Sequence, residues 1–191
     1  MGNLVDPVWN PVQLDPKASY SFLQVSYAGY AEEGETRLGS EVSYKHISTA
    51  QAGDIIISNI SAVYRAICVL PKWGEKLLLS SEFTILRIKD KNKLDPDYLW
   101  SVLRSSAVIA EWLSGATGVG RRRVDWDRLQ HQRIPLLGSP EQKEVGKLFR
   151  RAEAFKARIL QLEASALGAL APLELEGQLA TDRLARAKPP K

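Results

Sequence analysis

The stretch Gly53-Asp54-Ile55-Ile56-Ile57-Ser58-Asn59-Ile60 decides the fold class of this chain. The Gly-Asp pair is a turn signal, and the residues after it form a β-branched run of strand length. Comparable runs lie on both sides of it, at residues 20–27, 66–70 and 83–88. Residues 28–40 are rich in Gly and Glu and are expected to form a loop. These spacings predict a compact, mainly β unit in the first half of the chain.

Helix signals begin after this unit. Asp95 is placed as an N-cap, with Pro96 at the first helical position and Gly115 as the C-terminal stop. The stripe expected to face the core consists of Leu99, Val102, Leu103, Ile109, Trp112 and Leu113. A second, short helix through Leu129 is expected to be capped by Asp125.

The most regular pattern follows Ser139, which forms a predicted capping box with Gln142. Behind it, apolar residues repeat in heptads, and four unbroken heptads are typical of a coiled coil. One heptad position holds Val145, Ala152, Ile159 and Ala166, and the other holds Leu148, Phe155, Leu162 and Ala169. Pro172 is expected to end or bend this helix. The fold class is therefore α+β, with domains at 1–138 and 139–171 and a frayed basic tail at 172–191.

Composition excludes several classes of protein. The 191 residues are 45% hydrophobic and 25% charged, which indicates a globular chain, and no apolar run is long enough to cross a membrane. Residues 1–13 show no signal-peptide pattern. Cys68 lies in an apolar run and is expected to be a buried thiol in the cytoplasm. Two histidines and one cysteine are too few for a structural zinc site, so no metal is expected.

The basic excess starts after residue 100, and residues 139–191 carry ten Lys/Arg and seven Asp/Glu. Residues 1–100 carry 10 Lys/Arg and 12 Asp/Glu, whereas residues 101–138 carry six and three, within a net charge of +4. The candidate DNA-binding loop in this region contains Thr117, Gly118, Gly120, Arg121, Arg122 and Arg123. Glycine amides approach phosphates closely, and arginine forks bind phosphates or guanine edges. A solvated basic connector would have the same composition.

A second candidate surface lies between two apolar runs. Ser58, Asn59, Ser61, Tyr64 and Arg65 offer hydroxyl, amide, phenol and guanidinium groups that suit base edges and phosphates. An ordinary turn with satisfied polar groups explains the same residues and is the simpler interpretation. Tyr27 and Tyr30 flank a nearby loop, where either could be a contact or part of the core.

Enzyme signatures are mostly absent from the sequence. It has no phosphate-binding Walker loop and no nucleophile elbow, and its glycine loop has the wrong order for a dinucleotide site. Asp54 and Glu82 are the only positional candidates for nuclease carboxylates, and His46 and His131 are isolated. A small nuclease is the weakest of the functional hypotheses, and the chain is expected not to be an enzyme.

Four ordered stretches together resemble the DNA specificity subunit of type I restriction-modification systems. They are residues 53–58 (GDIIIS), 80–99 (with SSEF, LR and LDPDYL), 117–126 (TGVGRRRVDW) and 134–142 (IPLLGSPEQ). The set covers about residues 8 to 170. Gly138-Ser139 departs from the family's usual proline-leucine, which puts the geometry of the turn there in question. No base-reading residue carries over, because base contacts vary among members.

The resemblance implies a target recognition domain joined to one long helix. Such subunits bind duplex DNA and recruit a modification subunit, which methylates adenine with S-adenosylmethionine, and a nuclease subunit that uses ATP. The specificity subunit itself would bind no cofactor. Family members usually carry two recognition domains and two antiparallel helices, so this chain resembles half a subunit, either natural or truncated.

A helix with an apolar strip exposed to water is unfavourable, so the heptad residues need a partner helix. These residues are Val145, Leu148, Ala152, Phe155, Ile159, Leu162 and Ala166. A second copy, a modification subunit or the chain's own domain could cover them. A coiled-coil adaptor that binds only protein is therefore the alternative to a DNA-reading module.

Overall fold

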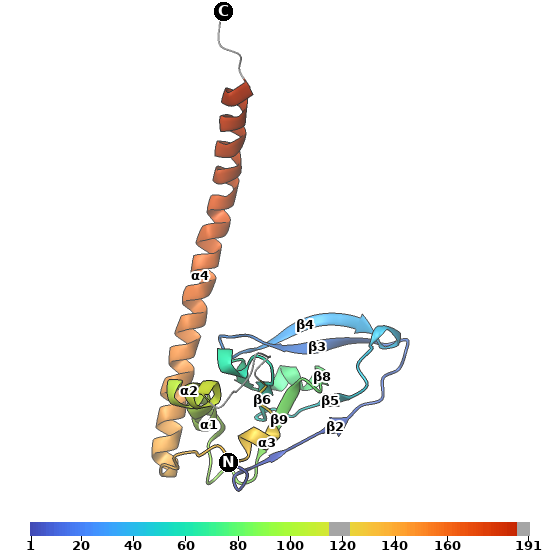
Figure 1. Ribbon diagram of the computed structural model, residues 1–191, viewed down its shortest axis with the longest axis vertical. Coiled ribbons are helices and arrows are strands. Elements are labelled where there is room, and N and C mark those ends of the chain that lie inside the picture. The colour runs from blue at the N-terminus through green and yellow to red at the C-terminus, as the bar shows by residue number, and fades with distance from the viewer. Residues whose placement is uncertain (115–122, 187–191) are drawn as a thin grey trace, which may run out of the picture. The chain divides into compact units, whose positions relative to one another are not determined.

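The computed structural model describes the backbone of residues 1–114 and 123–186, and side chains as far as residue 168. The chain divides into two units, Met1–Arg151 and Ala152–Lys191, which are considered separately here. The first unit contains all the strands and the helices α1 to α3 (Figure 1). It also contains the first turns of α4, so the boundary between the units lies at residue 151/152.

The first unit, Met1–Arg151, is called the compact unit below. A four-stranded antiparallel sheet forms its centre. Its strand order is β1-β9-β6-β7. The strands are β1 (Val5–Pro7), β6 (Ile55–Ser58), β7 (Ile67–Val69) and β9 (Phe83–Ile88). The predicted run at 55–60 is thus the inner strand β6, whose three isoleucines are fully buried. A continuous apolar run, without polar alternation, is typical of a strand covered on both faces.

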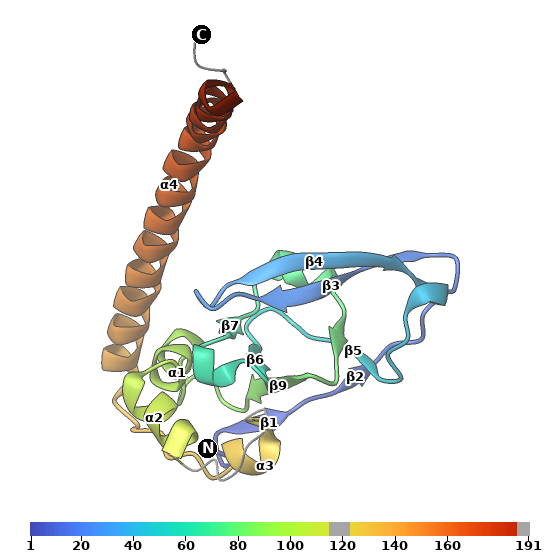
Figure 2. The ribbon, with the colours of Figure 1, turned by 45° about the horizontal axis from the view of Figure 1, so that its top comes forward.

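Smaller β elements surround this sheet. The strands are β2 (Asn10–Pro11), β3 (Ser19–Val25), β4 (Ala31–Leu38), β5 (Ile47–Thr49) and β8 (Leu79–Ser80), and three 3₁₀ helices lie at η1 (Gly39–Glu41), η2 (Ala62–Tyr64) and η3 (Lys72–Lys76). Strands β2, β5 and β8 form one sheet, and β3 and β4 form a hairpin (Figure 2). The expected loop at 28–40 is wrong over Ala31–Leu38. Pairing with β3 outweighs the low strand propensity of its Glu and Gly residues.

The two faces of the central sheet have separate cores, because side chains alternate along β6. Ile55 and Ile57 face helices and pack with residues such as Leu99 and Trp112. Ile56 faces the opposite side, where it packs in a cluster with Leu23 and Val25 of the hairpin. Cys68 belongs to this second core. Desolvation raises the pKa of its thiol to about 12, and the prediction of a buried thiol is confirmed.

The helix predicted from Pro96 to Gly115 is two helices, α1 (Pro96–Leu103) and α2 (Ser106–Ser114). Asp95 caps α1 as predicted, because its carboxylate accepts the Tyr98 amide at 2.9 Å. The break falls at Arg104 and Ser105, where the Ser105 hydroxyl accepts the Val108 amide at 3.4 Å. Serine favours such caps over helix interiors. The short helix α3 (Trp126–Leu129) is capped by Asp125 as predicted.

The helix α4 (Ser139–Arg186) is fastened to the compact unit near its start. Gln142 is 2% exposed; its side-chain oxygen accepts the Asp95 amide at 2.9 Å, and its nitrogen donates to the carbonyls of Lys93 and Leu137 at 2.9 and 2.8 Å. The side chain of Gln142 therefore does not close the predicted capping box. It joins the chain before α1 to the start of α4.

Beyond residue 151, the second unit is helical as far as Arg186, so α4 does not end at Pro172. A proline inside a helix removes one backbone hydrogen bond and costs about 3 kcal/mol, yet the helical backbone continues through Pro172. The helical backbone therefore includes most of the segment expected to be a frayed tail. None of the helices in the described part of the chain has the length and apolar character to cross a membrane.

The Gly-Asp turn before β6 shows why these two residues stand there. Gly53 has φ +89°, a conformation that favours glycine. Asp54 is 3% exposed, accepts the Gln51 amide at 2.8 Å, and binds Arg87 through both oxygens at 2.9 and 2.7 Å. This pairing raises the pKa of Arg87. Asp54 is thus a structural residue that joins the turn to β9.

Candidate nucleic-acid interface

The polar residues predicted at 58–65 lie where the end of β6 leads into η2. Ser58 is the last residue of β6, and η2 covers Ala62–Tyr64. The backbone of Arg65 has φ 66°, a left-handed conformation that turns the chain back into β7. The strand end and the 3₁₀ turn thus present several polar side chains within one short segment.

Asn59 is the exception in this segment. It is 5% exposed, and its side-chain oxygen accepts the Thr84 hydroxyl at 2.7 Å. Its backbone amide donates to the backbone carbonyl of Glu82 at 2.9 Å, and its backbone carbonyl accepts the Val124 backbone amide at 2.9 Å. The hypothesis that Asn59 binds DNA therefore has no support in these contacts, which give Asn59 a structural role between β6, β9 and residue 124.

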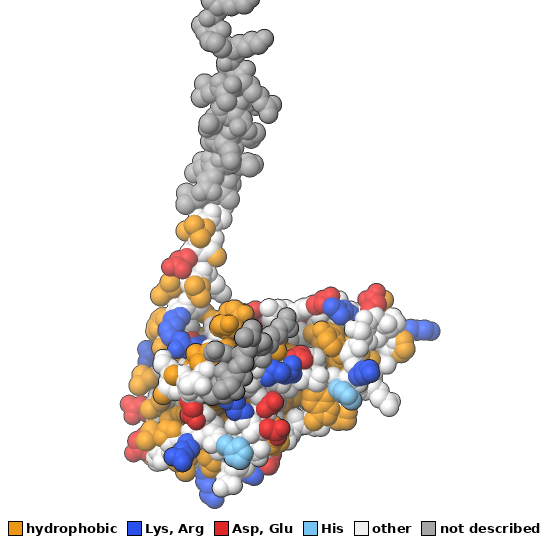
Figure 3. Space-filling model, viewed as in Figure 1, with side chains coloured by type: hydrophobic (Ala, Val, Ile, Leu, Met, Phe, Trp, Pro, Cys, Tyr) orange, Lys and Arg blue, Asp and Glu red, His pale blue; other side chains and the backbone are white. Residues whose placement is uncertain are grey.

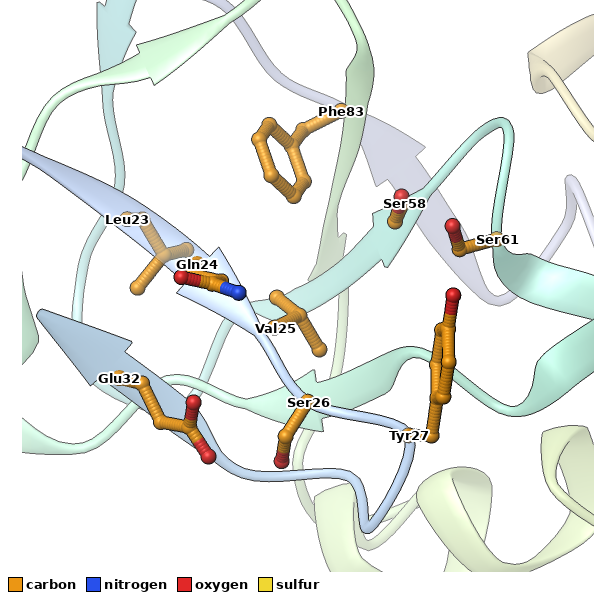
Figure 4. Close-up of a pocket in the computed structure, with 9 residues that line it drawn as sticks. All are labelled: Leu23, Gln24, Val25, Ser26, Tyr27, Glu32, Ser58, Ser61 and Phe83. Atoms are coloured by element: carbon orange, nitrogen blue, oxygen red, sulfur yellow. The ribbon is translucent and has the colours of Figure 1, made fainter. Parts of the chain in front are cut away.

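Ser58 and Ser61 line an open pocket, in which their hydroxyls lie beside each other (Figure 4). The end of β3 forms the other side of the pocket. Neither hydroxyl donates or accepts a hydrogen bond within the described part of the chain. Both serines thus line the pocket with unpaired hydroxyls, and their role as DNA contacts stays a prediction.

The exposed Tyr27 also lines this pocket, and the exposed Tyr64 lies against the Tyr27 ring. The rings of Tyr27 and Tyr64 are 64% and 63% exposed by residue and lie 5.7 Å apart, centroid to centroid. Tyr30 behaves differently, because its ring packs edge-on to Trp100 at 6.4 Å. Of the two tyrosines that flank the loop, Tyr27 is therefore at the surface and Tyr30 contributes to packing.

Of the predicted DNA-binding arginines, Arg65 and Arg123 lie within the described residues. Arg65 is exposed, and its guanidinium donates to the Ser106 hydroxyl at 3.0 Å, which holds it at the start of α2. Arg123 forms an ion pair with Glu82 at 3.0 Å, at the start of β9. The remaining loop candidates Thr117, Gly118, Gly120, Arg121 and Arg122 lie outside the described residues.

A buried arginine supports both sides of this surface. Arg104 is 5% exposed and donates to the Arg65 carbonyl at 2.7 Å. Its guanidinium also lies against the turn between β3 and β4, where Gly29 has φ +86°; a Cβ there would lie 1.7 Å from the Arg104 Nη1 atom. Arg104 thus fixes the β3–β4 turn and the left-handed turn at Arg65 relative to each other.

Charge on the visible face of the compact unit is mixed. Figure 3 shows lysine and arginine side chains interspersed with acidic ones over its described surface. Within the described part of the chain, no group of three His, Cys, Asp or Glu residues is arranged to hold a metal ion. Any attraction of this face to a polyanion therefore comes from a few local arginines and not from a broad basic field.

Sequence reasoning missed six residues that line the same pocket: Leu23, Gln24, Val25, Ser26, Glu32 and Phe83. Gln24 and Glu32 are register partners across the hairpin, which the sequence did not reveal because β4 was expected to be a loop. The alternation of buried Leu23 and Val25 around exposed Gln24 was the available signal for the exposed face of β3.

The predicted heptad seam is exposed along its whole described length. Leu148, Phe155, Ile159 and Leu162 are 56%, 63%, 54% and 53% exposed. Val145 is 38% exposed, and Ala152 and Ala166 are exposed as well. A different set of side chains on α4, including Gln142 and Phe149, contacts the compact unit. The partner expected for this seam stays a prediction.

No family model matches the chain, and no curated protein matches it either. Solved structures do match. The HsdS subunit from Thermoanaerobacter tengcongensis is 17% identical, with a TM-score of 0.58 over 97% of this chain and 51% of that one. A chain from a structure titled for complex assembly and conformational transition of the type I R-M system is 16% identical, with a TM-score of 0.61 over 98% and 52%.

The chain spans about half the length of these two solved chains. The likeness extends over the strand-rich unit and the long helix together, and it confirms the predicted α+β fold class. At such low identity it concerns the fold alone. The chain therefore has the fold of about half of each of these two solved chains, a strand-rich unit followed by a long helix.

Proposed function

We propose that this chain recognises duplex DNA as a half-length specificity subunit of a type I restriction-modification complex. In this role it directs adenine methylation and cleavage that partner subunits carry out in the cytoplasm with S-adenosylmethionine and ATP. The observation that carries the proposal is the group of unpartnered polar side chains at one end of the central sheet, on a fold shared with HsdS. Two arginines flank this group, and the exposed Tyr27 and Tyr64 lie beside it.

The surface chemistry supports DNA as the ligand. Hydroxyls at Ser58 and Ser61 and the phenol of Tyr64 suit base edges and sugars, and Arg65 suits a phosphate or a guanine edge. Arg121, Arg122 and Arg123 would add phosphate contacts. A module with few phosphate contacts binds non-specific duplex weakly, at roughly 10⁻⁴ to 10⁻⁶ M at physiological salt.

A gel shift on random duplexes tests this proposal. Affinity should fall steeply with salt. Replacing Arg121, Arg122 and Arg123 together by alanine should make the slope of log affinity against log salt shallower, as expected for the loss of up to about three phosphate contacts. The matched control replaces Arg133, Lys143 and Lys147, which lie outside the proposed surface, by alanine. If the control flattens the salt dependence equally, or the first variant leaves it unchanged, the loop is not part of the interface.

Reconstitution tests the wider role. The chain alone should transfer no methyl group and cleave no DNA. Addition of the modification subunit from the same host, with S-adenosylmethionine, should produce sequence-specific adenine methylation. Methyl transfer or metal-dependent cleavage by the highly purified chain alone would contradict the proposal.

The exposed seam supports self-association as part of this function. An apolar strip of this length is unfavourable in water and is covered most simply by the same strip of a second copy. A two-fold dimer would present two recognition units, so its target would be a bipartite palindrome. Antiparallel pairing follows from the family resemblance, because the heptads alone do not fix direction.

The same seam favours a second candidate, a coiled-coil adaptor that binds only protein. The gel shift separates the two functions. An adaptor would associate through the seam and show no affinity for duplex DNA at low salt.

A further inference from the structure

The pocket beside Ser58 has a volume of about 470 Å³, within the range of about 300–1,000 Å³ that is typical of small-ligand sites. It lies between the end of β3 and the ends of β6 and β9, and all of its lining residues belong to the compact unit. The pocket is open to solvent on one side. A small molecule or part of a larger one can therefore enter it.

The walls of the pocket combine apolar surface with unpaired polar groups. Leu23 and Val25 are 4% and 8% exposed, and the ring of Phe83 faces the space between the strands (Figure 4). Ser58 and Ser61 present their hydroxyls on one side, and Gln24 and Glu32 line the other side from the hairpin. Within the described residues, none of these four polar side chains has a hydrogen-bond partner.

The polar groups indicate the chemistry of the ligand. The lining includes a carboxylate, Glu32, but no lysine or arginine, so the pocket disfavours a phosphate. A glutamate accepts a hydrogen bond from an exocyclic amine, and a glutamine both accepts from and donates to adenine. The flat ring of Phe83 suits a planar ring system. These features together fit an amine-bearing nucleobase.

We propose that this pocket receives one nucleobase that has left the base stack of bound DNA, and that it prefers adenine or cytosine over thymine. The proposal rests on the DNA-reading function proposed above. A base within a duplex is covered on both faces by its neighbours, so only an extruded or unpaired base can enter a concave pocket. The exposed rings of Tyr27 and Tyr64 lie next to the opening, where aromatic side chains can stack on a displaced base.

Free nucleosides test the pocket without duplex DNA. Deoxyadenosine and deoxycytidine should bind in NMR titrations, and thymidine should bind at least about fivefold more weakly. Glu32→Gln should remove this discrimination. Glu33→Gln is the matched control, because it removes the same charge from the same strand outside the pocket lining. Phe83→Leu keeps an apolar side chain but removes the flat ring, and should weaken binding by about tenfold.

Mismatched duplexes test the same pocket in bound DNA. A single mismatch lowers the cost of extruding a base. A duplex that is mismatched at the extruded position should therefore bind the wild type more tightly than the matched duplex does, and Phe83→Leu should show no such preference. Nucleoside binding without duplex binding would uphold the pocket and overturn the DNA-reading function. Duplex binding without nucleoside binding or mismatch preference would overturn the pocket and leave the DNA-reading function in place.

Discussion

The compact unit and the helix beyond residue 151 differ in how far their apolar side chains are exposed to solvent. In the compact unit, Ile55, Ile56 and Ile57 are completely buried, whereas Phe155, Ile159 and Leu162 in the helix are each more than half exposed. A folding unit that covers its own apolar surface is stable alone, and a single helix with an apolar strip is not. The comparison shows that the first region covers its own apolar side chains, whereas the described part of the helix leaves its apolar side chains exposed.

The largest effect is expected when a charge is placed inside the compact unit. Ile56→Asp would bury an unpaired carboxylate, which costs several kcal/mol out of a total stability of about 5–15 kcal/mol. We expect the strand-rich unit to be largely unfolded at 25 °C, as measured by circular dichroism and urea titration. Cooperative unfolding within about 1 kcal/mol of the wild type would show that this core is not as closed as its burial indicates.

The same change in the helix should have a different outcome. Ile159→Asp should leave the compact unit folded but abolish self-association, because a dimer would bury the carboxylate at a cost of several kcal/mol. Sedimentation at tens of micromolar measures this. The matched control is Leu160→Asp, since Leu160 is equally exposed but lies outside the heptad seam.

Two sedimentation results would contradict the seam dimer. One is a wild-type monomer at tens of micromolar, and the other is an Ile159→Asp protein that still dimerises. If the wild type is monomeric and gains a partner only with the modification subunit, the seam serves recruitment.

A smaller effect is expected where α4 meets α1 inside the compact unit. Arg150 donates to both carboxylate oxygens of Asp97, one of them at 2.6 Å from Nε, and its guanidinium lies 5.4 Å from the Trp100 ring centroid. The hydrogen bond to Asp97 raises the pKa of Arg150. Because the Arg150 side chain is 47% exposed, Arg150→Ala should lower the free energy of unfolding by only about 1 kcal/mol.

Arg151→Ala is the control for this contact. Arg151 is exposed and has no ion pair among the described residues, so its loss should change stability by less than about 0.5 kcal/mol. Equal effects of the two substitutions in urea titrations would show that the Asp97 contact contributes nothing to stability.

An effect of similar size is expected at high pH, and it concerns the thiol of the second core. The pKa of Cys68 is raised to about 12 by burial, from an ordinary value of 9.0. Below pH 9 both folded and unfolded thiols are protonated, so stability is unaffected. Between pH 9 and 12 the unfolded thiol ionises first, and stability should fall by about 1.4 kcal/mol at pH 10.

Cys68→Ala isolates this contribution, because tyrosines and lysines titrate equally in both proteins. Urea titrations at pH 8 and pH 10 should show a smaller loss in the variant than in the wild type. A thiol reagent provides a second measurement: native Cys68 should react only when the compact unit unfolds, whether or not the helix has a partner. Rapid labelling of the folded protein would contradict the burial of this side chain.

Much of the architecture could be predicted, because strong local signals coincide with the observed elements. The runs at 55–60 and 83–88, the Asp95 and Asp125 caps and the heptads all correspond to elements of the structure. Strand β4 could not be predicted, since its glutamates and glycine favour a loop until β3 supplies a pairing partner. The break at Arg104 depends on one serine that caps the next helix in a sequence that otherwise favours one helix.

The candidate site was only partly visible from the sequence for the same reason. Ser58 and Ser61 follow directly after a predicted strand and could be identified by position. Gln24 and Glu32 reach the pocket through the hairpin that went unrecognised, and Phe83 looked like an ordinary strand residue. Asn59 has the chemistry of a DNA contact, but its hydrogen bonds to Glu82, Thr84 and Val124 become evident only in three dimensions.

The backbone at Arg65 has one further consequence. A residue other than glycine in a left-handed conformation carries a penalty of about 1–2 kcal/mol, and glycine at this position would avoid it. Arg65→Gly should therefore make the protein harder to denature. The chain instead keeps a guanidinium there, held by Ser106 beside the proposed DNA surface. If that guanidinium contacts DNA, Arg65 lowers thermal stability but raises DNA affinity. Selection for thermostability alone would then be expected to replace Arg65 with glycine.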